Sequence, residues 1–118
     1  MERGVLIGLV VCLLVAGVAG AEEDMGHLEP AGVGASCATT TATVSWSAVN
    51  DNHLAGYNVY EASAPGWTYV RINAGLVTST QYPVANLQPG TAYGFGVVAV
   101  YNDGHTSVMG GPATCTTA

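Results

Sequence analysis

Residues 87–93 read LQPGTAY, and this short stretch does most to decide the fold. Pro89 and Gly90 favour a turn, since proline presets one backbone angle and glycine accepts the left-handed conformation. The longest alternating run in the chain follows, with apolar side chains at every second position: Tyr93, Phe95, Val97 and Ala99. A period of two is typical of a β-strand that buries one face.

Shorter runs with the same period precede this one: Thr43–Trp46, Tyr57–Tyr60, Tyr69–Asn73 and Tyr82–Leu87. Pieces rich in Gly, Asn, Asp, Ser and Pro separate the runs, and these residues favour turns. Beyond residue 21, no segment shows the i, i+3, i+4 spacing of an amphipathic helix. The sequence therefore predicts an all-β fold, an antiparallel β-sandwich of about seven strands. Pro83 cannot donate to a strand ladder, so its strand should lie at a sheet edge.

The composition restricts both the size and the partners of the protein. The chain has 118 residues, which argues for one domain at most. Only 8% of the residues are charged, the formal net charge is -6, and the positive residues are Arg3 and Arg71 alone. A basic surface for nucleic acid is absent, so we expect no nucleic-acid partner.

The first 21 residues have the layout of a secretory signal peptide. Arg3 precedes an almost wholly apolar run from Val5 to Val18, and Ala19–Ala21 is a small-residue cleavage pattern. We expect cleavage after Ala21, which leaves a secreted or cell-surface protein without a membrane segment. An uncleaved anchor is the alternative, although the apolar run is short for a membrane span.

Residues 22–32 are acidic and contain Gly and Pro, which is typical of a flexible tail. His27 falls within this tail and is expected to be solvated. The remaining residues, 33–118, form the predicted globular domain.

Cleavage would remove Cys12 and leave Cys37 and Cys115. An even number of cysteines in an exported chain predicts a disulfide, and two unrelated buried thiols are the alternative. The two positions are 115 − 37 = 78 apart. On the chain-entropy model, closing such a loop stabilises the fold by about 4–5 kcal/mol.

Four pieces of the chain carry further motifs: Val44–Trp46 (VSW), Gly56–Tyr60 (GYNVY), Leu87–Tyr93 (LQPGTAY) and Ala99–Ser107 (AVYNDGHTS). In order and spacing they resemble the second strand, the third strand, the corner before the sixth strand and the loop before the last strand of a fibronectin type III domain. The resemblance covers about residue 33 to the C-terminus. It implies an immunoglobulin-like Greek-key sandwich, with Trp46 in the core and the Tyr93 hydroxyl hydrogen-bonded to upstream backbone.

The cysteine pair departs from the family pattern, because most members lack it. The resemblance places Cys37 at the end of the first strand and Cys115 at the end of the last. Both would then lie at the same pole, where a bridge between them would tie the chain ends together.

Two loops contain an aspartate followed two positions later by a histidine: residues 50–53 (NDNH) and 102–105 (NDGH). The resemblance implies that both loops emerge at the same pole of the sandwich. Their side chains then form a candidate metal site, since imidazole and carboxylate are ligands of Zn²⁺. The candidate ligands are Asp51, His53, Asp103 and His105. Turn chemistry alone is the simpler alternative, because turns favour Asn, Asp and Gly.

The resemblance also implies an exposed face on the sheet that contains the third, fourth and sixth strands. Alternation directs Val70 and Ile72 toward the core and leaves the other residues of these strands outside. The candidate interface consists of Tyr60, Tyr69, Val98 and Val100, with Trp67 in the loop nearby. Exposed aromatic and aliphatic side chains often mark an interface, and aromatic rings can also hold sugars. Ordinary cross-strand packing is the alternative.

The sequence contains no recognisable nucleophile motif, so we expect neither an enzyme nor a bound cofactor. It predicts a secreted or cell-surface, non-catalytic binding or structural module. The partner would be an extracellular protein or a polysaccharide. The alternatives are the metal site described above and an extracellular structural subunit that associates with itself.

Overall fold

The computed structural model describes residues 27–118, so the predicted signal peptide and residues 22–26 lie outside the described residues. The described part forms seven strands: β1 (Ala31–Cys37), β2 (Ala42–Ser47), β3 (Leu54–Ser63), β4 (Val70–Arg71), β5 (Gln81–Val84), β6 (Ala92–Tyr101) and β7 (Gly110–Thr116). Among these residues, none belongs to a helix with the length and apolar character needed to cross a membrane.

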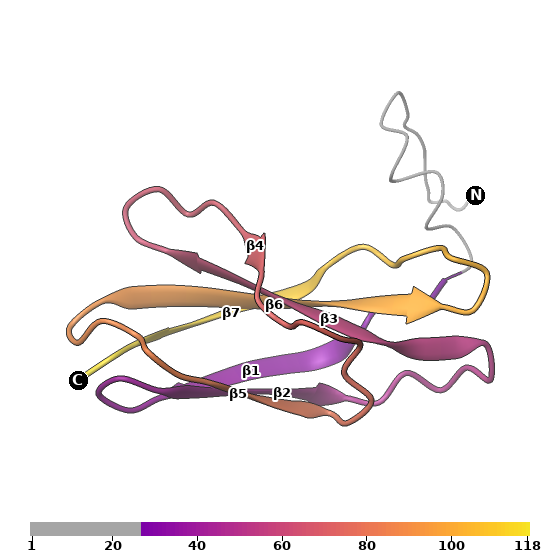
Figure 1. Ribbon diagram of the computed structural model, residues 1–118, viewed down its shortest axis with the longest axis horizontal. Helices are drawn as coiled ribbons and strands as arrows, with labels where there is room; N and C mark the ends of the chain where they lie inside the picture. The colour runs from indigo at the N-terminus through magenta and orange to yellow at the C-terminus, as the bar shows by residue number, and fades with distance from the viewer. Residues whose placement is uncertain (1–26) are drawn as a thin grey trace.

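The strands form two antiparallel sheets that pack face to face (Figure 1). One sheet has the order β1-β2-β5, and the other has the order β4-β3-β6-β7. This arrangement confirms the predicted all-β sandwich. Pro83 lies in β5, which is an edge strand as predicted. At an edge, the backbone N–H that proline lacks is not needed for hydrogen bonds to a second neighbouring strand.

The core lies between the sheets and is built by the alternation seen in the sequence. Val44 and Trp46 of β2 face Tyr57 and Val59 of β3, and all are at least 95% buried. The rings of Trp46 and Tyr57 meet edge to face, with centroids 5.2 Å apart. Such a contact adds to the free energy of apolar burial.

The structure differs from the sequence prediction in two places, the start of the domain and the side chain of Val70. β1 begins at Ala31, and Pro30 before it is fully buried, so the sandwich starts before residue 33. Val70 is 60% exposed rather than directed into the core. β4 has only two residues and lies at a sheet edge, where Val70 pairs with Glu61, whose carboxyl pKa is raised by partial burial.

Tyr93 closes the turn that precedes β6. Its ring is buried beside Leu87, and its hydroxyl oxygen accepts a hydrogen bond of 2.8 Å from the backbone N–H of Gln88. The bond confirms the corner that the sequence motif implies. It fixes the angle at which the chain enters the longest strand.

Replacement of Tyr93 by Phe should test this corner. The variant keeps the ring but leaves the Gln88 N–H without its partner, so the free energy of unfolding should fall by about 1–3 kcal/mol. Urea denaturation would measure the change. Tyr82→Phe is the control, because that hydroxyl donates only a long bond of 3.4 Å to the Ile72 carbonyl. Equal effects of the two changes would contradict the role given to Tyr93.

Cys37 and Cys115 form a disulfide with a Cα–Cα distance of 5.7 Å. Cys37 ends β1 and Cys115 lies near the end of β7, so the bond joins one sheet to the other. The bond agrees with the pairing expected for an exported chain. It closes a loop between residues 78 positions apart.

The double variant Cys37→Ala with Cys115→Ala should lower the free energy of unfolding by about 4–5 kcal/mol, because the unfolded chain regains the entropy of an open loop. Urea denaturation of the oxidised wild type and the double variant would measure this. The reduced wild type should behave like the double variant. An unchanged denaturation midpoint in both would show that the disulfide contributes no stability.

Candidate functional site

The two NDxH stretches contain the same Asx turn, in which the aspartate side chain accepts a hydrogen bond from the backbone two residues later. The backbone N–H of His53 donates to Asp51 Oδ1 at 2.8 Å, and that of His105 donates to Asp103 Oδ1 at 2.9 Å. In each turn the imidazole also contacts the carboxylate. His53 Nδ1 lies 3.3 Å from Asp51 Oδ1, and His105 Nδ1 lies 2.9 Å from Asp103 Oδ2. Turn chemistry therefore accounts for both aspartates.

The two turns lie at the same pole of the sandwich. β3 begins directly after the first turn and β6 ends directly before the second, and Leu54 pairs with Tyr101. The backbone N–H of Asn102 donates to the His53 carbonyl oxygen at 2.8 Å, which joins the turns directly. Gly104 has a φ of 91°, a left-handed conformation that favours glycine and permits the tight second turn.

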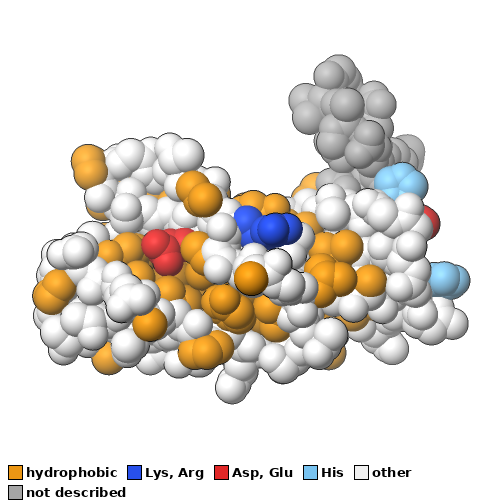
Figure 2. All heavy atoms as spheres, viewed as in Figure 1, with side chains coloured by type: hydrophobic (Ala, Val, Ile, Leu, Met, Phe, Trp, Pro, Cys, Tyr) orange, Lys and Arg blue, Asp and Glu red, His pale blue; other side chains and the backbone are white. Residues whose placement is uncertain are grey.

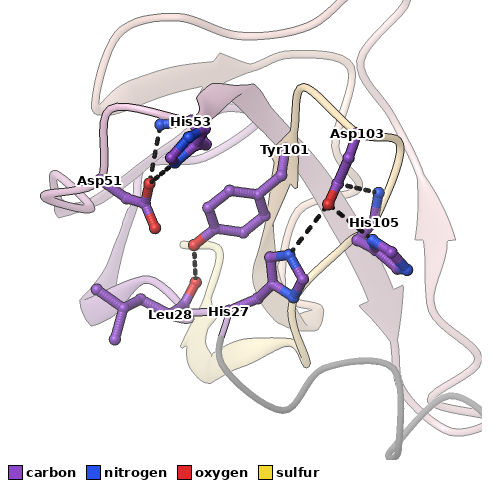
Figure 3. A network of polar contacts seen from close by, with 7 residues as sticks. All are labelled: His27, Leu28, Asp51, His53, Tyr101, Asp103 and His105. Atoms are coloured by element: carbon purple, nitrogen blue, oxygen red, sulfur yellow. Dashed lines mark hydrogen bonds and ion pairs between the residues drawn. The ribbon is translucent and has the colours of Figure 1, made fainter.

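Tyr101 lies between the two turns (Figure 3). Its side chain is buried, and its hydroxyl donates a 2.5 Å hydrogen bond to the backbone carbonyl of Leu28. Burial, and secondarily the negative charge of Asp51, raise the pKa of the Tyr101 hydroxyl, which therefore remains a donor. Tyr101 thus holds the segment before β1 against the end of β6.

His27 is placed by this contact, and the prediction that it is solvated was wrong. Its side chain is only 21% exposed, and its ring lies 4.6 Å from that of Tyr101. Its Nε2 atom lies 3.6 Å from Asp103 Oδ2, and its ring centroid lies 5.0 Å from that of His105. Spacing in the sequence gives no sign of this contact, because 76 positions (103 − 27) separate the two residues.

The structure thus divides the four residues of the predicted metal site. Asp103 and His105 gather with His27, and one ligating atom from each lies within 4.8 Å of the others. Asp51 and His53 form a separate pair across Tyr101 (Figure 3). A pocket of about 500 Å³ connects the two sides, lined by His27, Asp51, His53, Tyr101, Asn102 and Asp103.

The Asp103 carboxyl is the most perturbed acid of this pole. The hydrogen bond from the His105 side chain, followed by that from the His105 backbone, lowers the pKa of Asp103 to about 2. A folded-state pKa below the unfolded value means that the ionised carboxylate stabilises the fold. This stabilisation is present above pH 4 and is lost as the pH falls from about 4 to about 2.

An NMR titration of the Asp103 carboxyl carbon in EDTA-treated protein should therefore give a pKa of about 2. His105→Ala removes the largest cause, so the midpoint should rise toward 3.8, the ordinary value. His53→Ala, in the matching turn, should leave it unchanged. A wild-type midpoint near 3.8 would contradict the pairing of Asp103 with His105.

A second feature lies on the outer face of the four-stranded sheet. The rings of Trp67 and Tyr69 rest on Gly94 of β6: a Cβ atom there would lie 3.3 Å from Trp67 Cζ3 and 2.5 Å from Tyr69 Oη. Trp67 remains 41% exposed, whereas Tyr69 is half-buried. We call Trp67 and Tyr69 the aromatic pair.

The structure revises the predicted interface set around this pair. Val98 is only 8% exposed, so its prediction as a surface residue was wrong. It lies in β6, an inner strand of the four-stranded sheet between β3 and β7. Tyr60 and Val100 are half-buried. Side chains from other segments cover this face above the glycines of β6, since a Cβ atom on Gly96 would lie 2.1 Å from Met109 Sδ. Gly94 and Gly96 were the signal in the sequence that could have indicated this cover.

Comparisons with known proteins agree with the geometry. The family model described as fibronectin type III domain matches residues 29–114. Endoglucanase B of Cellulomonas fimi is 39% identical over 88 residues, which make up 72% of this chain and 8% of that protein. The chain therefore spans less than a tenth of that relative.

Solved structures show the same fold. An Fn3-like protein from Clostridium thermocellum is 29% identical, with a TM-score of 0.62 over 75% of this chain and 91% of that one. Module A71 of titin from human cardiac muscle has a TM-score of 0.64 at 20% identity, over 72% of this chain and 86% of that one. The titin likeness bears on the fold alone.

Proposed function

Because this chain belongs to the fibronectin type III family, we propose that it is a non-catalytic module outside the cell that binds a neutral polysaccharide through the aromatic pair. The family match covers residues 29–114, so almost the whole described chain is the module itself. Such sandwiches serve many roles, and the role therefore has to be argued from the surface.

The observation that carries the proposal is the exposure of Trp67 beside Tyr69. An indole ring that is 41% exposed leaves an apolar surface in water, which favours a binding partner. Trp67 has a φ of 55°, uncommon for a residue other than glycine, asparagine or aspartate. A strained backbone that holds an aromatic ring at the surface is typical of functional positions.

Charge and relatives favour an uncharged carbohydrate over a charged partner. Arg71 is the only lysine or arginine among residues 27–118. Figure 2 shows few charged side chains on the face in view and apolar side chains that gather along its middle. The relative from Cellulomonas fimi is an endoglucanase, which supports a carbohydrate-related setting for this module.

The proposed extracellular location rests on two observations. The first 21 residues have the layout of a signal peptide, and Cys37 and Cys115 form a disulfide, a bond typical of oxidising compartments. No membrane association is expected once the leader has been removed.

Sedimentation with insoluble β-glucan should test the proposal. The wild type should pellet with the polysaccharide, and Trp67→Ala should bind about thirtyfold more weakly, since truncation of a central aromatic residue costs about 2 kcal/mol. Gly94→Ala should also weaken binding, because the added Cβ displaces the rings of Tyr69 and Trp67 from their position over residue 94.

Val108→Ala is the matched control, since Val108 is exposed to a similar degree (42%) and lies outside the aromatic pair. Circular dichroism would verify that each variant is folded. If wild type and Trp67→Ala sediment equally, or neither sediments, the polysaccharide proposal is wrong. Size-exclusion chromatography would then show whether the aromatic pair instead mediates self-association.

A further inference from the structure

The two NDxH turns can be compared directly, because each has an aspartate whose Oδ1 atom accepts the backbone N–H of the histidine two positions later. Within residues 27–118, only the second turn has a third metal-ligating side chain within 4.8 Å of its own. His27 Nε2 lies 3.6 Å from Asp103 Oδ2, and the same oxygen lies 2.9 Å from His105 Nδ1. Turn formation explains Asp103, but it does not explain why His27 is brought to it.

We propose that His27, Asp103 and His105 bind one divalent transition-metal ion of the Zn²⁺ class. The ion would join the segment before β1 to the turn between β6 and β7. Two imidazoles and one carboxylate suit zinc and its neighbours, whereas Ca²⁺ and Mg²⁺ require a larger set of oxygen ligands. This site is separate from the aromatic pair and does not depend on the proposed function.

All three ligand atoms lie within 4.8 Å of one another, and two of their separations are close to those that such an ion requires. Bonds of about 2.0–2.2 Å in a tetrahedral arrangement place neighbouring ligand atoms about 3.3–3.5 Å apart. The separation of 3.6 Å between His27 and Asp103 is near this range, and the 2.9 Å separation between Asp103 and His105 must open by about half an ångström. The Asp103 and His105 side chains are 55% and 47% exposed and can rotate to do so. Water would take the fourth position.

The surrounding contacts already orient two of the ligands. Asp103 Oδ1 accepts the His105 backbone N–H, which leaves Oδ2 directed toward both histidines (Figure 3). His27 is positioned by the Tyr101 ring and by the bond from Tyr101 to the Leu28 carbonyl. Supporting bonds of this kind raise metal affinity because they restrict the ligands before the ion arrives.

The backbone after His27 is also fixed, so that the histidine cannot easily leave the turn. Pro30 is fully buried. A Cβ atom on Gly110 would lie only 2.2 Å from the Pro30 carbonyl oxygen, so this glycine provides the space in which the segment lies. A ligand next to an anchored segment loses little conformational entropy when it binds.

The charge of this pole favours a cation over an anion. Asp51 and Asp103 both line the pocket, while the single arginine of the described residues lies in β4. Carboxylates that line a pocket without a neighbouring lysine or arginine attract positive ions. Asp51 would contribute through its charge and not as a ligand, because it lies with His53 beyond Tyr101 (Figure 3).

Calorimetric titration of the full chain with ZnCl₂ tests the site, with His27→Ala, His105→Ala and His53→Ala as variants. We expect one Zn²⁺ per chain in the wild type. Binding should weaken at least about tenfold in the first two variants, since loss even of a residue that only supports a ligand costs about 10–100-fold. His53→Ala, the matched change in the other turn, should bind like the wild type.

NMR provides a second readout that does not depend on heat. Zn²⁺ should shift the imidazole signals of His27 and His105 and slow hydrogen exchange at the Leu28 and Glu29 amides. Circular dichroism in EDTA would verify that every variant is folded before the ion is added. The proposal is overturned by absence of heat and shifts in the wild type, by unchanged binding in His27→Ala, or by equal loss in His53→Ala.

Discussion

The rest of the structure depends on the register between β3 and β6. These two strands pair from Leu54↔Tyr101 at one end to Ser63↔Tyr93 at the other. Because one NDxH turn directly precedes β3 and the other directly follows β6, this register alone brings the two turns together. The same pairing sets Gly94 opposite Ala62 on the outer face. Gly94 there leaves the space in which the rings of Trp67 and Tyr69 lie. A slip of one residue would turn every core side chain of β6 outward, so the buried face and both surface features are specified together.

Much of this register could be predicted from the sequence, because its determinants are local. Alternation in the run from Tyr93 to Ala99 identifies the core face, and the proline and glycine before it determine where the strand begins. The antiparallel β-sandwich followed from these features, whereas the corner at Tyr93 was implied by the resemblance to a fibronectin type III domain. The common pole of the two turns was likewise implied by that resemblance.

Three residues could not be placed in this way, because their surroundings are set by segments far away in the chain. Val98 alternates correctly to the outer face but is buried, and side chains from other segments partly cover that face. Val70 lies in a strand too short to bury it. His27 precedes the first strand, and contacts with distant residues, among them the bond from the buried Tyr101 hydroxyl, bring that segment to the second turn.

The edge strand β1 shows why both ends of this small sandwich need fixing. A domain of fewer than about 100 residues buries a modest apolar area, and edge strands fray where little apolar surface holds them. Most residues of β1 are small (AGVGASC), and its single valine is only half-buried. Its last residue is held by the disulfide to β7. At its start, Pro30 and the bond from Tyr101 to Leu28 provide the anchor, and a metal ion on His27 would strengthen that end without adding to the core. The disulfide at one end and the proposed ion at the other would thus supply stability that the side chains of β1 cannot.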